Sequence, residues 1–185
     1  MLNEGLDRDS IVTKAMGVLC GIAAVVGIAV CFMGLGFLNL IIAVANGLLA
    51  FVCFVAHDRE KEIILGAVGA VIAAELIGLV IGVHTTTVVV NTLVSLLCYV
   101  AIFLYIFGNN VTRNRAMWGG AVLVVDTGLK LINLSSTLQL VERTGLVSEE
   151  AIGVYKTAAC ATALTIVPAF AITLLLFMGL LNYGN

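Results

Sequence analysis

The chain has 185 residues, of which 62% are hydrophobic and 11% are charged, and its formal net charge is −2. Soluble globular domains carry about 25% charged residues, so this composition excludes an ordinary water-soluble fold. No basic cluster occurs along the chain, and we therefore also exclude nucleic-acid binding. The length suits one domain.

The first 14 residues form a polar start that leads directly into a long apolar run. They mix acidic with basic side chains, whereas a secretory signal has a positive start and a short apolar region before a cleavage site. We therefore interpret residues 1–14 as a short polar tail before an uncleaved membrane span. Residues 15–185 are predicted to form a single transmembrane helical domain whose partner is the lipid bilayer.

Residues 15–56 are the first long apolar stretch, interrupted by Asn39 and Asn46. As one helix it would measure about 63 Å, twice the hydrocarbon thickness of about 30 Å, so it must fold back. Gly34 and Gly36 predict the turn, because glycine tolerates backbone conformations that other residues avoid. A tight helical hairpin is therefore expected at the start of the domain.

Residues 63–107 form the second apolar stretch, and the polar segment 84–87 is its predicted turn. Residues 117–134 form the shortest and least apolar span. The fold class is therefore all-α, a polytopic membrane bundle of about six helices. The six predicted spans are 15–33, 37–56, 63–83, 87–107, 117–134 and 158–181.

Residues 135–157 are predicted to be a polar connector between the last two spans. Ser148, followed by two glutamates, has the pattern of a helix N-cap with acidic residues in the first turn. Such a helix can continue from residue 149 into the last span. Pro168 then frees the carbonyl of Leu164, which a neighbouring group must satisfy.

Three ionisable residues fall inside predicted spans: Glu75, Asp126 and Lys130. A mid-span Asp or Lys costs about 2.5–3.5 kcal/mol, so such residues usually face the bundle interior or water. Asp126 precedes Lys130 by one helical turn, which favours an ion pair. The helical rise places all three about 14–20 Å from one membrane face, and we therefore predict one interior polar cluster.

The sequence leaves two interpretations of this cluster open. The cluster is either a substrate or ion site in which Glu75 is a titratable or cation-binding carboxylate, or a structural ion pair that fixes helix rotation. The candidate binding residues are Glu75, Asp126, Lys130, Asn46, Asn91 and Ser95.

Small residues recur every four positions along the third span, which favours close helix packing in a bilayer. We expect this face to contact another helix of the same chain, with a subunit interface as the alternative. Its residues are Gly66, Ala70, Ala74, Gly78 and Gly82.

No pattern of catalytic, cofactor-binding or metal-binding residues is found. The five cysteines lie in apolar runs without a C-x-x-C pair, which indicates buried hydrophobic residues. His57 and His84 lie at predicted opposite membrane edges, so haem ligation by both is not expected. We expect no catalytic residue, metal or cofactor, and the chain is not expected to be an enzyme.

Two functions are favoured over a third, a membrane enzyme that uses the mid-span carboxylates. The first is a small transporter or channel-like protein with a mid-membrane polar site. The second is a non-catalytic structural or assembly subunit of a larger membrane complex. In either case we expect a homo-oligomer or partner membrane subunits.

The distribution of Lys and Arg predicts that both termini are cytoplasmic, in a plasma or bacterial inner membrane. Short cytoplasmic loops are enriched in these residues. With the N-terminus inside, the outer side holds only Arg143 and Lys156. The inner side holds Arg8, Lys14, Arg59, Lys61, Arg113 and Arg115.

Reporter fusions at the two ends test this topology. Both ends should report the cytoplasmic side, because the predicted number of spans is even and the positive loops lie with the termini. Ends that report opposite sides would show an odd number of spans.

Overall fold

The computed structural model describes residues 5–34, 36–55, 58–81, 86–108, 111–144 and 148–183. In these ranges the chain forms six α-helices and one two-stranded sheet, so the predicted all-α class is confirmed. The helices are α1 (Ile11–Phe32), α2 (Leu38–Phe54), α3 (Glu60–Ile81), α4 (Thr86–Phe107), α5 (Arg113–Thr144) and α6 (Glu149–Met178). The strands are β1 (Gly5–Leu6) and β2 (Leu181–Asn182).

The lengths and surfaces of the helices are those of an integral membrane bundle. Every helix except α2 is long and apolar enough to cross a membrane, and α2 is an apolar helix of 17 residues. Large apolar side chains cover the outside of the bundle; Phe32 is 89% exposed and Val80 is 83% exposed. Soluble proteins rarely expose so many apolar side chains to water, whereas a surface that faces lipid tails commonly carries them.

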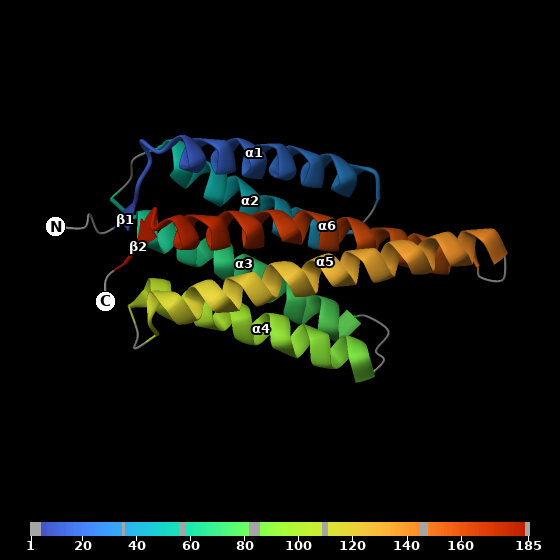
Figure 1. Cartoon of the computed structure of the whole chain (residues 1–185). Coiled ribbons are helices and arrows are strands. Elements are labelled where there is room, and N and C mark those ends of the chain that lie inside the picture. Colours follow the sequence, from blue (N-terminus) through green and yellow to red (C-terminus); the bar gives the residue numbers. More distant parts are fainter. Residues whose placement is uncertain are drawn as a thin grey trace.

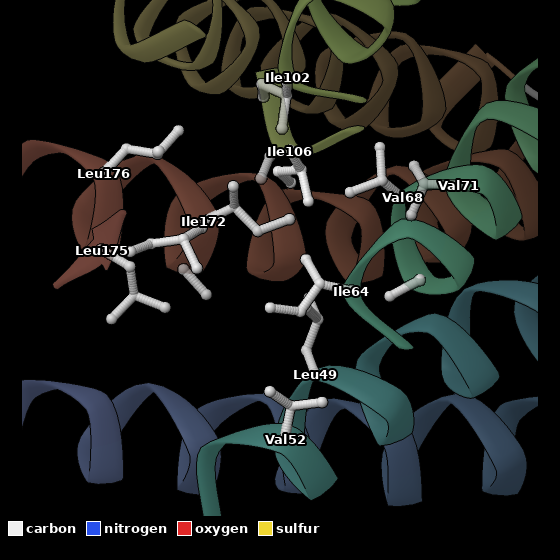
Figure 2. Packing of buried hydrophobic residues seen from close by; sticks show 14 of the residues in the cluster. Leu49, Val52, Ile64, Val68, Val71, Ile102, Ile106, Ile172, Leu175 and Leu176 are labelled. Atoms are coloured by element: carbon white, nitrogen blue, oxygen red, sulfur yellow. The ribbon is translucent and has the colours of Figure 1, made fainter. Parts of the chain in front are cut away.

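Each helix packs against the next one in the chain, and α6 closes the bundle against α1 and α2 (Figure 1). The paired strands β1 and β2 lie at one end of the bundle. Figure 2 shows the interior near this end, where apolar side chains of four helices interlock. The labelled residues are Leu49, Val52, Ile64, Val68, Val71, Ile102, Ile106, Ile172, Leu175 and Leu176.

Strand pairing, hydrogen bonds and an ion pair hold the N-terminal segment against the bundle. β1 pairs antiparallel with β2, with Leu6 opposite Leu181. Glu60, the first residue of α3, accepts hydrogen bonds from the Leu6 amide (2.7 Å) and the Tyr183 hydroxyl (2.6 Å), and it pairs with Arg8. Burial and the bond to Glu60 raise the pKa of the Tyr183 phenol, which therefore keeps the proton it donates.

The turn predicted at Gly34 and Gly36 is present. α1 ends at Phe32, α2 begins at Leu38, and the two glycines have φ of 81° and 86°, values that glycine adopts without strain. Of the second predicted turn, at 84–87, residues 84 and 85 lie outside the described residues, and residues 86 and 87 begin α4.

The α5–α6 hairpin differs most from the expected structure. The span predicted to be shortest, 117–134, belongs to the longest helix, because α5 has 32 residues and continues to Thr144. Most of the predicted connector is thus helical, and the hairpin extends beyond the other helices (Figure 1). A partly buried stripe recurs at helical spacing along this part of α5: Leu131, Leu134, Leu138 and Val141. Polar residues on the other face lower the average hydropathy of this segment, and for this reason the sequence did not predict a helix there.

The predicted start of α6 is confirmed, and the break at Pro168 has the partner it needs. The Ser148 hydroxyl accepts from the Ala151 amide at 3.4 Å. The Leu164 carbonyl, which lacks its helical donor because of Pro168, accepts from Asn46 Nδ2 at 3.3 Å. Asn46 is fully buried on α2, so this bond fastens α2 to α6 at the proline.

Close helix contact occurs at two glycines of α1, Gly17 and Gly27. A methyl group added at Gly27 would lie 2.8 Å from Ala43 Cβ, and one at Gly17 would lie 2.7 Å from Cys53 Cβ. These positions let α1 approach α2. By contrast, a methyl group at Gly78 would meet no atom of the described residues within 4 Å.

The small-residue face predicted on α3 therefore does not pack closely against another helix of the same chain along its whole length. Gly66 is exposed, Ala70 is partly buried, Ala74 is buried, and Gly82 lies outside the described residues. The reason is that α3 turns a neighbouring stripe inward, formed by Ile64, Ala67, Val68, Val71 and Ala74. Contact of the outward face with a second copy stays a prediction.

Alanine substitutions at two glycines separate these packing roles. Gly27→Ala should lower the unfolding free energy by about 1–3 kcal/mol, because the added methyl overpacks the α1–α2 contact. Gly78→Ala should be neutral or stabilising by up to about 1 kcal/mol, because alanine is the better helix former. Thermal unfolding in detergent compares the two. Destabilisation by Gly78→Ala would indicate that another molecule packs there.

Candidate functional site

A polar group joins α4 and α5 inside the bundle. Lys130 Nζ lies 3.0 Å from Asp126 Oδ2, so the ion pair expected one helical turn apart is present. Ser95 of α4 contacts both partners: its hydroxyl lies 2.6 Å from Asp126 Oδ2 and accepts from Lys130 Nζ at 2.7 Å. Each of the three side chains thus contacts the other two.

Burial makes this arrangement a strong local constraint. Ser95 is 1% exposed, and the side chains of Asp126 and Lys130 are 16% and 18% exposed. Hydrogen bonds that involve an ionised group are roughly twice as strong as neutral ones, and water competes little at this depth. The triangle therefore fixes the rotation of α5 relative to α4.

Glu75 of α3 belongs to the same electrostatic environment. Its carboxylate interacts electrostatically with Lys130 and with Asp126. It has no hydrogen bond, and no cation within 4.0 Å, in the part of the chain that the structure describes. The ammonium of Lys130 is instead held by Asp126 and Ser95.

Tyr99 adds a group that the sequence analysis did not single out. It is 1% exposed on α4, and its hydroxyl has no hydrogen-bond partner in the described structure. It interacts electrostatically with Glu75 and Asp126. The signal available in the sequence was the spacing of Asn91, Ser95 and Tyr99, one turn apart along a single helix face.

The two asparagines of the predicted site have different surroundings. Asn91 is half-buried, and its backbone carbonyl lies 3.2 Å from the Ser95 hydroxyl. Asn46 donates to the carbonyls of Ile42 (3.0 Å) and Leu164 (3.3 Å), and its Oδ1 has no partner in the described structure. Its amide nitrogen therefore supports α6 instead of the group around Glu75.

The formal charges of this site do not balance. Asp126 and Glu75 carry two negative charges when ionised, and Lys130 carries one positive charge, so one negative charge remains. A charge at this depth is costly unless it is paired or neutralised. The arrangement can therefore accept one proton or one monovalent cation beside Glu75.

Nothing in the described ranges groups three or more His, Cys, Asp or Glu side chains as a metal site. No protein family model, curated protein or solved structure matches the chain. The fold and the site thus define its class, a helical membrane bundle with an interior charged group.

A double-mutant cycle tests the triangle. Lys130→Met should destabilise the protein by about 3 kcal/mol, because it leaves Asp126 buried without its cation. The double variant Asp126→Asn/Lys130→Met should recover most of that loss, as expected for neighbouring residues. Unfolding in detergent at neutral pH measures both.

Lys156→Met is the matched control for this cycle. It removes a pair with Glu142 whose side chains are 49% and 44% exposed, and such pairs contribute at most about 1 kcal/mol. Equal destabilisation by the single and double variants would show that Asp126 and Lys130 are not coupled.

Proposed function

We propose that this protein is a small membrane transporter or channel-like protein that binds a proton or a monovalent cation at Glu75. The observation that carries the proposal is the Glu75 carboxylate, which has no ion-pair partner among the described residues. It interacts electrostatically with Tyr99, whose buried hydroxyl also lacks a hydrogen-bond partner among those residues. Intramembrane ionisable residues generally mark ion pathways and proton relays.

The residues of the site have separate roles in this proposal. Asp126, Lys130 and Ser95 form the fixed part, because their charges and hydrogen bonds satisfy one another. Glu75 is the group that changes its occupancy. Tyr99 offers one donor and one acceptor, and it is suited to contact the bound cation or the protonated carboxyl group.

The orientation belongs to the same proposal. The Lys and Arg distribution favours cytoplasmic termini in a plasma or bacterial inner membrane. α3 begins at that end with Glu60, so Glu75 lies about 22 Å further along the helix axis. The site is then nearer the outer end of α3.

Flux through reconstituted vesicles tests the function. Purified protein in liposomes should dissipate an imposed gradient of protons, Na⁺ or K⁺, and Glu75→Gln should reduce this flux at least tenfold while the protein remains folded. Glu62→Gln is the matched control, because Glu62 lies on the same helix with a side chain that is 72% exposed. Equal flux in the wild type and Glu75→Gln would contradict the role of Glu75.

A structural or assembly subunit of a larger complex is the second candidate. Two observations favour it: the α5–α6 hairpin extends beyond the other helices (Figure 1), and the small-residue face of α3 has open space at Gly78. Such a subunit should co-purify with fixed membrane partners and carry no flux alone. A self-contained protein or homo-oligomer that carries flux would favour the transporter.

A further inference from the structure

An apolar groove of ≈ 330 Å³ lies on the outside of the bundle between α5 and α6. Met117, Trp118 and Ala121 form its α5 side, and Phe170, Leu174 and Phe177 form its α6 side. The two helices are antiparallel neighbours in Figure 1. From Met117 to Val124 the α5 wall is about 10 Å long.

A cation lies beyond one end of this groove. Arg113 is the first residue of α5 and lies one helical turn before Met117. Its Nε donates to the Leu176 carbonyl at 3.0 Å, and its Nη2 donates to the Phe177 carbonyl at 3.4 Å. These bonds place the guanidinium beside a residue of the groove wall, at the end of the bundle that carries β1 and β2.

The guanidinium keeps donors for a further ligand. Arginine has five N–H donors in a planar fork, and the two bonds to α6 use two of them. The remaining donors suit the oxygens of a phosphate, which arginine binds with two parallel hydrogen bonds. An apolar groove with such a group beyond its end matches one molecule with a phosphate and a hydrocarbon tail.

We propose that this groove binds one phospholipid, with an acyl chain against the α5–α6 walls and the phosphate at Arg113. The location fits a lipid, because the groove opens on the apolar surface and Arg113 lies at the end of the helix. Charge complementarity favours an anionic headgroup, since the Arg113 guanidinium is positively charged and Arg115, exposed two residues further along α5, adds a second positive charge at the same end of the helix. This site does not depend on the function proposed for Glu75.

Binding of defined lipids to the delipidated full chain tests the proposal. Native mass spectrometry in detergent should detect one tightly bound phosphatidylglycerol and weaker binding of phosphatidylethanolamine. Inorganic phosphate alone should neither bind nor compete, because the acyl chain supplies much of the affinity. Competition by inorganic phosphate at equal concentration would show a simple anion site and overturn the lipid assignment.

Two variants probe the two halves of the site. Arg113→Gln should weaken phosphatidylglycerol binding roughly tenfold or more, because a charge-assisted contact is lost. Ala121→Trp should abolish the tightly bound lipid by filling the groove, whereas the neighbouring Val122→Trp, a residue 47% exposed and outside the groove, should not.

Ala121→Trp also keeps the test decisive if Arg113→Gln fails to fold, since it leaves the bonds to α6 intact. Unchanged lipid binding in Ala121→Trp would overturn the proposal. So would dissociation of a dimer by Ala121→Trp, because it would show that a second copy of the chain occupies the groove.

Discussion

The structure depends on the cost of leaving a charge or a hydrogen-bonding group alone in hydrocarbon. Asp126 and Lys130 meet this constraint together, with Ser95 of the neighbouring helix between them. The same constraint explains why Asn46 reaches the carbonyl that Pro168 leaves free. Packing alone would leave helix rotation loosely defined, because lipid competes with every apolar contact. The interior hydrogen bonds and the ion pair therefore fix the rotation of the helices relative to one another.

Against this background, Glu75 and the hydroxyl of Tyr99 stand out. The neighbouring groups are bonded to one another, whereas these two lack hydrogen-bond partners within the described chain. A site of this kind combines a rigid part with a part that can change its occupancy. Rigid surroundings reduce the cost of binding, and an uncompensated carboxylate supplies the affinity for a cation. This combination underlies the proposed transport function.

Local chemistry in the sequence predicted the features that depend on neighbouring residues. The turn at Gly34 and Gly36, the cap at Ser148 and the pair of Asp126 with Lys130 all follow from spacing along one segment. The extension of α5 to Thr144 was missed because the stripe on α5 is stabilised by α6, a contact that average hydropathy does not register. Likewise, small-residue spacing located a face on α3 but not the direction in which that face points.

The central claim is that Glu75 changes its protonation or cation occupancy inside the membrane. Infrared difference spectroscopy of the protein in lipid bilayers observes this directly, because protonated and ionised carboxyl groups absorb at different frequencies. Our account predicts a carboxyl band that responds to pH or to the transported cation, is absent in Glu75→Gln and persists in Glu62→Gln. A spectrum in which no responsive band disappears with Glu75→Gln would contradict the account.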